Sequence, residues 1–165
     1  MHLQTLTSRF LRYNLWANER LTSWLLTLDR SILYQQTGSS FGTLDRTLQH
    51  LVSAQLYWHP IIGSGQILEF NQSFKDNVVE DVIAELVKSS HQFVNSFSTL
   101  SEQQLLEPVH ASDSTQSRYE YILHVVNHGS YHRGQIVTLC RALGVTEEIP
   151  VTDYDAYLWW IENME

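Results

Sequence analysis

HVVNHGSYHRGQ, residues 124–135, carries three histidines at intervals of four, one for each turn of a helix. Residues four apart lie on one helix face, about 40° apart around the axis and roughly 6 Å apart along it, so two histidines can bind one ion. His128 and His132 fall among apolar residues, whereas His124 lies on the opposite flank of the pair. Buried imidazoles need polar partners, which a metal ion, a carbonyl group or a water molecule can provide. The stretch therefore predicts either a metal site or two hydrogen-bonded core histidines.

A third metal ligand is expected from another helix, because His124 and His132 lie about 12 Å apart along the axis of their own helix. Two histidines of the second predicted helix, His50 and His59, are candidates. The helical wheel places His59 closer to the apolar stripe, but it precedes Pro60 at the predicted helix end, a poor place to fix a ligand. The periodicity leaves the choice between them open.

Several functional classes are excluded. The metalloprotease motif needs a glutamate directly after its first histidine, and Gly129 follows His128. The glycines of residues 63–65 follow no strand and precede no lysine, so they form no phosphate-binding loop. The formal net charge is -8, with acidic residues spread along the chain, which disfavours nucleic acid as a partner. No apolar run is long enough to cross a bilayer, so no membrane partner is expected.

The length of 165 residues fits one domain, residues 1–165, that can bury a core without disulfides. The single cysteine, Cys140, cannot form an internal disulfide, and the N-terminus does not have the layout of a signal peptide. The expected location is the cytoplasm.

Apolar residues recur at helical spacing in four long segments, residues 3–28, 43–61, 77–97 and 118–143. Asn77, with Glu80 three positions later, is the expected cap of the third segment. Capping boxes are expected at Ser101 and Ser117, and Gly144 ends the last long helix. Residues 62–76 are the longest connection, with a short extended piece at 67–70, and residues 110–115 are a polar loop. A short terminal helix follows residues 150–155. The predicted fold is all-α, a four-helix bundle with a short C-terminal helix.

Three motifs of this chain resemble those of the DinB family of damage-inducible metalloproteins. They are YNLWAN at residues 13–18, LQHL at 48–51 and VNHGSYHRGQI at 126–136. The resemblance spans essentially the whole chain, and the last motif is its most specific part. It implies an up-down-down-up order of the four helices. It also implies that His50, His128 and His132 hold a divalent ion, which we expect to be Zn²⁺, with Ni²⁺ as the rival.

The DinB family includes bacillithiol S-transferases, mycothiol transferases and a mycothiol-dependent maleylpyruvate isomerase. The resemblance thus implies an enzyme that activates a thiol or a water molecule at a three-histidine site, of the thiol S-transferase or hydrolase type. Because Cys140 lies on the apolar far flank of its helix, the thiol would be a diffusible low-molecular-weight cosubstrate. The alternative is a non-catalytic metal-binding stress protein, favoured if a protein side chain fills the fourth position on the ion. An interaction module, suggested by the aromatic C-terminus, is a third alternative.

The polar candidates for a catalytic role are Asn14, which lies on the stripe of the first helix, Tyr57 and His124. Arg133 sits on the opposite side of its helix from the ligands, which favours a structural or interface role. A homodimer is also expected, because the last long helix carries more apolar surface than one core face requires. Its interface would include part of the far side of this helix (Ile122, Val126, Gly129, Arg133, Val137) or the terminal aromatic residues.

Overall fold

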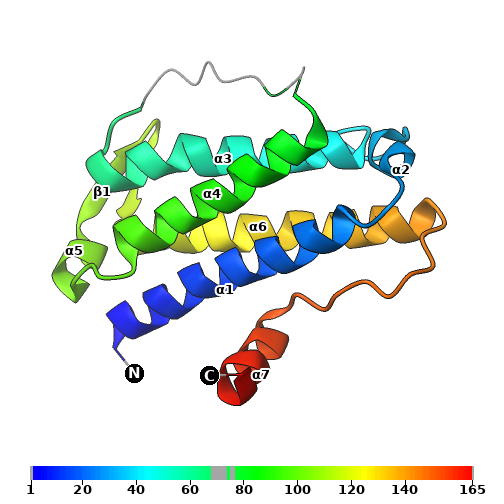
Figure 1. The fold of residues 1–165 in the computed structure, drawn as a ribbon. Coiled ribbons are helices and arrows are strands. Elements are labelled where there is room, and N and C mark those ends of the chain that lie inside the picture. Colours follow the sequence, from blue (N-terminus) through cyan, green and yellow to red (C-terminus); the bar gives the residue numbers. More distant parts are fainter. Residues whose placement is uncertain (1, 68–73, 75–76, 165) are drawn as a thin grey trace.

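The computed structural model describes residues 2–67, 74 and 77–164 (Figure 1). Within them the chain forms α1 (Leu3–Leu25), α2 (Arg30–Tyr34), α3 (Leu44–Ser64), α4 (Val79–Phe97), α5 (Glu102–Leu106), β1 (Pro108–Ala111), β2 (Ser114–Ser117), α6 (Arg118–Ala142) and α7 (Tyr154–Met164). The four long helices α1, α3, α4 and α6 form a bundle in which α1 and α3 each contact both α4 and α6. Figure 1 shows α1 and α6 running in one direction and α3 and α4 in the other. The predicted four-helix bundle with up-down-down-up order is therefore confirmed.

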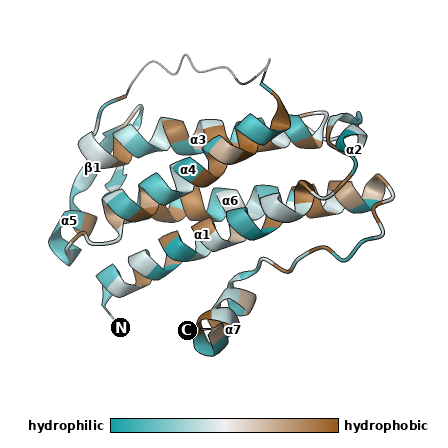
Figure 2. Ribbon diagram, in the orientation of Figure 1, coloured by the Kyte–Doolittle hydropathy of each residue, from teal (hydrophilic) through white to brown (hydrophobic). Residues whose placement is uncertain are grey.

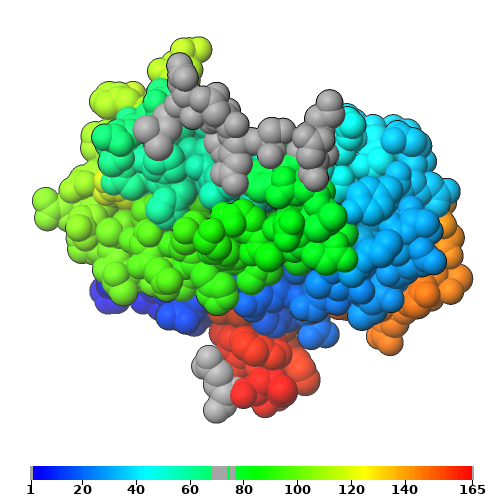
Figure 3. All heavy atoms as spheres, turned by 45° about the horizontal axis from the view of Figure 1, so that its top comes forward, coloured from blue at the N-terminus to red at the C-terminus, as the bar shows by residue number. Residues whose placement is uncertain are grey.

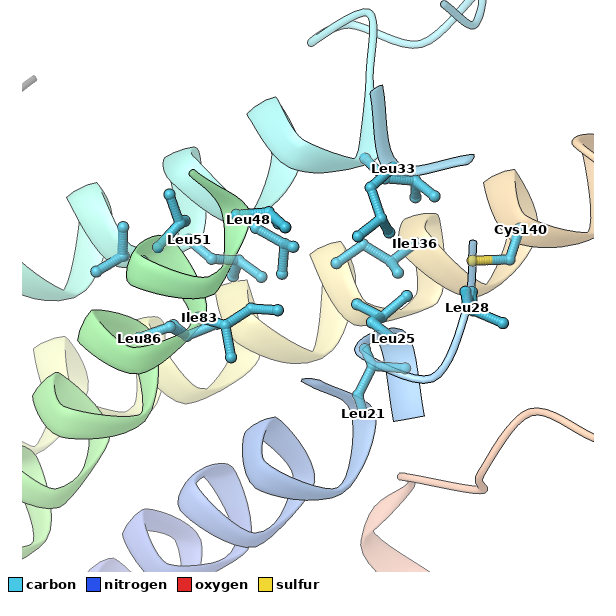
Figure 4. Close-up of a cluster of buried hydrophobic side chains, with 14 of the residues drawn as sticks. Leu21, Leu25, Leu28, Leu33, Leu48, Leu51, Ile83, Leu86, Ile136 and Cys140 are labelled. Atoms are coloured by element: carbon cyan, nitrogen blue, oxygen red, sulfur yellow. The ribbon is translucent and has the colours of Figure 1, made fainter. Parts of the chain in front are cut away.

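The apolar stripes of the four long helices meet in the interior. Hydrophobic residues recur along each ribbon between hydrophilic ones, as Figure 2 shows. Figure 4 shows one buried cluster, to which α1, α3, α4 and α6 each contribute. Its labelled members are Leu21, Leu25, Leu28, Leu33, Leu48, Leu51, Ile83, Leu86, Ile136 and Cys140. Burial raises the pKa of the Cys140 thiol to about 11, so this thiol is an unreactive part of the core, as the sequence predicts.

The helix ends follow local chemistry that the periodicity only partly reveals. α1 ends at Leu25 rather than at residue 28. A turn at residues 26–28 separates it from α2, whose cap Asp29 accepts a hydrogen bond from the Ser31 backbone N–H. The predicted end of α3 at residue 61 is too early. This helix continues to Ser64, and Gly65 caps it with a φ of 69°, the left-handed conformation that glycine tolerates best. The predicted extended piece at 67–70 lies outside the described residues, apart from Ile67.

The start of α4 differs from the prediction. Val78, not Asn77, occupies the cap position, and no side chain caps the helix there. Instead, the hydroxyl of Tyr34 on α2 accepts a hydrogen bond of 3.1 Å from the Val79 backbone N–H. A tertiary contact therefore satisfies a donor that the sequence assigns to a local cap.

Both predicted capping boxes are present, at Ser101 before α5 and at Ser117 before α6. The segment between them, predicted as a polar loop at 110–115, is instead part of a β-hairpin in which β1 pairs with β2. Each strand has four residues, too few for a period of two to stand out from a loop. Alternate residues of β1, Val109 and Ala111, are buried against the end of the bundle.

The terminal helix α7 packs against α1 through aromatic rings. Tyr13 contacts both Tyr154 and Tyr157, with ring centroids 5.2 and 5.8 Å apart, and Trp16 contacts Tyr157 and Trp160. The Tyr13 hydroxyl also donates a hydrogen bond to the Thr152 carbonyl. In the space-filling view of Figure 3, α7 projects from the bundle beneath α1.

Much of the far side of α6 is covered within the chain itself. Ile122, Val126 and Arg133 are at most 4% exposed, and Gly129 is also buried. These residues are therefore not available to a second copy, and the homodimer stays a prediction that would need other surfaces. None of the described helices combines the length and the apolar character of a membrane-spanning segment.

Candidate metal centre

Three histidines from two helices converge at one edge of the bundle. His50 is carried by α3, and His128 and His132 lie one turn apart on α6. The Nε2 atom of His128 lies 3.0 Å from that of His50 and 3.1 Å from that of His132. One ring nitrogen from each of the three lies within 4.8 Å of the others. The structure thus brings together the three residues that the resemblance implies as ligands, and this group could hold a metal ion.

The protonation of the three rings favours a cation between them. The Gln135 side-chain oxygen accepts a hydrogen bond of 2.7 Å from Nδ1–H of His132, which leaves Nε2 of that neutral ring with a lone pair. Nε2 of His128 faces two ring nitrogens, and a single proton there would have to be shared between both contacts. A tetrahedral zinc ion with bonds of about 2.0–2.1 Å would hold neighbouring nitrogens about 3.3 Å apart. The two separations from His128, 3.0 and 3.1 Å, are close to that value, and the third pair of nitrogens lies within 4.8 Å, so the donors are compatible with such an ion.

Aromatic rings hold the imidazoles in place. Phe41, just before α3, stacks on His50 with centroids 4.4 Å apart and also contacts the edge of His132. The Tyr131 ring also contacts His132, with ring centroids 5.1 Å apart. As a result, His132 is only 5% exposed, whereas His50 and His128 are half-buried. The site therefore has a closed side and a side nearer to solvent.

The surroundings keep the histidines neutral at physiological pH. Burial, together with the neighbouring His132, His50 and His124, lowers the pKa of His128 from its ordinary value of 6.5 to about 4. Burial lowers the pKa of His50 and of His132 as well. Neutral imidazole is the form that binds metal ions, so these lowered pKa values favour metal binding by the cluster.

This pKa shift predicts a pH dependence of stability in the metal-free protein. Since His128 has a pKa of about 4 in the folded state and an ordinary value of 6.5, the unfolded chain binds more protons between these pH values. The free energy of unfolding should therefore fall as the pH is lowered through this window and change little from this source above it. Urea unfolding of the chelated protein across the window measures the effect. The His128→Gln variant should show a shallower dependence, and identical slopes would contradict the assignment.

On the far side of α6, Arg133 is a buried cation, 2% exposed. Its Nη1 donates hydrogen bonds of 2.8 Å to the side-chain oxygens of Asn14 and Asn18 on α1. Its Nη2 donates to the Ser130 hydroxyl, and the guanidinium lies 5.4 Å from the centre of the Tyr13 ring. In the described part of the chain, no carboxylate forms an ion pair with Arg133. Its role is thus structural, because it links α6 to α1.

Gly129 provides the space for this arrangement. A Cβ atom built at this position would lie 2.6 Å from the Asn14 side-chain oxygen and 2.9 Å from Nη1 of Arg133. Asn14, a candidate for a role beside the ion, therefore directs its oxygen to Arg133 rather than to the histidines. Asn18 extends the network by donating to the Ser90 hydroxyl of α4. Asn14 and Asn18 of α1 thus fix the position of α6, the helix that carries His128 and His132, through their hydrogen bonds with Arg133.

The remaining candidates, His124, Tyr57 and His59, are not members of the three-histidine group. The His124 ring is 5.9 Å from that of His128 and contacts Trp58 at 5.1 Å, with part of its surface exposed. Burial of the remainder lowers its pKa. Tyr57 packs against Trp58, and His59 is hydrogen-bonded to the Ser96 hydroxyl of α4, outside the three-histidine group.

Gln135 and Phe41, which orient the ligands, are not among the residues that the sequence analysis singles out. Gln135 could have been found, because it lies three residues after His132 on the same helix face. Phe41 could not, since it lies in the turn that precedes α3.

Comparisons with known proteins agree with this architecture. A model of the DinB family matches residues 1–165. Protein DinB of Bacillus subtilis (strain 168) is 29% identical over 161 residues, which cover 89% of this chain and 90% of that protein. The crystal structure of a DinB-like protein from Bacillus cereus ATCC 10987 superposes with a TM-score of 0.64 at 25% identity, covering 86% of this chain and 94% of that one.

Proposed function

Because this chain belongs to the DinB family, we propose that it is a divalent-metal-dependent enzyme that activates a thiol or a water molecule. His50, His128 and His132 would hold the ion, with Zn²⁺ as the first choice and Ni²⁺ as the rival. The observation that carries the proposal is the convergence of three imidazole nitrogens from α3 and α6. Bound there, a divalent ion would supply a Lewis acid that lowers the pKa of a thiol or of water.

The composition of the cluster supports catalysis over a purely structural role. Structural zinc sites are usually closed by four protein ligands, whereas catalytic sites keep one position open. In the described residues, the group contains three histidines and no further His, Cys, Asp or Glu. All three ligands would be neutral, so none of them offsets the charge of the ion. An incoming anion such as a thiolate would therefore be favoured.

The surrounding side chains have separate roles in this proposal. Gln135 holds the proton on Nδ1 of His132 and so keeps Nε2 of that ring available. Phe41 covers His50 and limits the access of water from its side. His124 is the proposed proton acceptor, since its lowered pKa leaves it neutral and part of its ring is exposed near His128.

The proposed thiol is a diffusible cosubstrate. Cys140 is fully buried in the core and its raised pKa disfavours the thiolate, so the chain has no cysteine to use. Thiol transfer to an electrophile is accordingly the first choice, and hydrolysis by activated water is the second.

The test uses the protein loaded with cobalt, whose absorption spectrum reports on its ligands. Addition of a low-molecular-weight thiol, such as cysteine, should produce a new absorption band, and the zinc-loaded protein should consume the thiol in the presence of an alkylating electrophile. His124→Gln should keep its metal content and lose activity by about 10²-fold, the usual contribution of a general base.

Cys140→Ser is the matched control and should keep both the band and the turnover. If no thiol changes the cobalt spectrum while an ester is cleaved, hydrolysis is the correct reaction class. If neither thiols nor esters react, the protein is a non-catalytic metal-binding protein and the proposal is wrong.

A further inference from the structure

A hollow lies away from the histidines, on the side of the bundle where α7 packs against α1. It has a volume of about 610 Å³ and is bounded by the first half of α1, the residue after α4 and the inner side of α7. Its polar lining includes Arg9, Arg12, Thr5, Ser8 and Ser98. Since α3 and α6 carry the three metal-binding candidates, this hollow shares no residue with the metal centre.

Its charge contrasts with that of the whole molecule. The chain has 18 acidic and 10 basic residues, and yet none of the described residues that line the hollow is an aspartate or a glutamate. Neither Arg9 nor Arg12 forms an ion pair or a side-chain hydrogen bond with any other described residue. The two cations are three residues apart on one helix, where like charges repel each other. A bound anion would relieve this repulsion.

The remaining polar groups complement an oxyanion. The hydroxyls of Thr5, Ser8 and Ser98 make no hydrogen bond within the described part of the chain, so they are free to donate to a ligand. A guanidinium group binds carboxylate and phosphate groups through paired hydrogen bonds. The hollow is thus lined by two guanidinium groups and three hydroxyls, all of which can donate hydrogen bonds to the oxygen atoms of an anion.

We propose that this hollow binds a small molecule with more than one anionic charge, carried by phosphate or carboxylate groups, between Arg9 and Arg12. The volume of about 610 Å³ is suited to a metabolite rather than to a polymer. Such a ligand also bridges α1 and α7, and it stabilises the docking of α7 because both helices line the hollow.

The test follows backbone amide signals by ¹H–¹⁵N NMR while the metal-loaded, full-length protein is titrated with inorganic phosphate or with citrate at constant ionic strength. Saturable shifts are expected for residues 4–12 and for Ser98. The two titrations distinguish phosphate from carboxylate groups as the preferred anion. Arg9→Gln and Arg12→Gln should each weaken binding about tenfold, the effect expected for a lost charge-assisted contact.

Arg20→Gln is the matched control, because it removes the same charge from an exposed position of α1 outside the hollow. It should leave the affinity unchanged. Three results would overturn the proposal: no saturable shift with either anion, equal weakening in all three variants, or shifts confined to signals around His128, which would place the anion at the metal centre instead.

Discussion

Replacing His128 by alanine is expected to lower the affinity for a divalent ion by more than about a hundredfold, since even the loss of an outer partner of a metal ligand costs about 10- to 100-fold. His128 is the central member of the group, because its Nε2 atom contacts those of both His50 and His132. Alanine at either of these positions should have a similar effect. Elemental analysis of the dialysed proteins measures it.

Two other histidines serve as matched controls for the metal centre. His59 is hydrogen-bonded to Ser96, and the exposed His91 is paired with Glu19. Their alanine variants should retain the metal content of the parent protein. A His50→Ala protein with a full complement of metal would show that the ion is held elsewhere.

The second large effect is expected from Gly129→Ala, which should lower the free energy of unfolding by about 2–3 kcal/mol, in the range of overpacked cores. The added methyl group would lie 2.6 Å from the Asn14 side-chain oxygen. Asn14 cannot move away at little cost, because it is 3% exposed and its oxygen accepts a hydrogen bond from the buried Arg133. Either the bond breaks or α6 shifts relative to α1. Urea unfolding compared with the parent protein measures the loss.

Gly134→Ala is the control on the same helix. A Cβ atom at this exposed position meets no heavy atom within 4 Å, so the usual preference of alanine over glycine should stabilise the helix by up to about 1 kcal/mol. Opposite signs for the two variants are expected. A neutral Gly129→Ala would mean that the Asn14–Arg133 contact is not fixed in solution.

The bundle itself could be predicted from the sequence because its signals are local. The apolar periods give the four long helices, and Ser101 and Ser117 fix two helix starts through bonds within three residues. The i, i+4 spacing of His128 and His132 likewise predicts their common face. The start of α4 could not be predicted in this way, because the hydroxyl that binds its first N–H comes from Tyr34, 45 positions away.

The choice between His50 and His59 shows a second limit. A helical wheel ranks residues by their distance from the apolar stripe, and it therefore favours His59. The metal centre, however, lies at an edge of the bundle, where the half-buried His50 faces α6 from the flank of its stripe. The family resemblance was needed to make this choice.

Arg133 shows a third limit. Its apolar neighbours suggest an outward-facing interface, although α1 covers this side of α6 with the side-chain oxygens of Asn14 and Asn18. The signal was present as two asparagines four residues apart on the first helix and a glycine four residues before the arginine. Only their placement in three dimensions shows that they belong together.

The attachment of α7 determines how water can reach the buried cation. Tyr13 lies between α7 and the buried guanidinium of Arg133. Its hydroxyl donates a hydrogen bond to the Thr152 carbonyl, just before α7, and its ring covers the guanidinium. If α7 opens locally while the four long helices stay folded, Tyr13 loses both this bond and the cover of Tyr154 and Tyr157. The amide protons of α7 should then exchange with solvent before those of α1 and α6. Hydration of the cation would accompany this partial opening, well before the bundle itself unfolds.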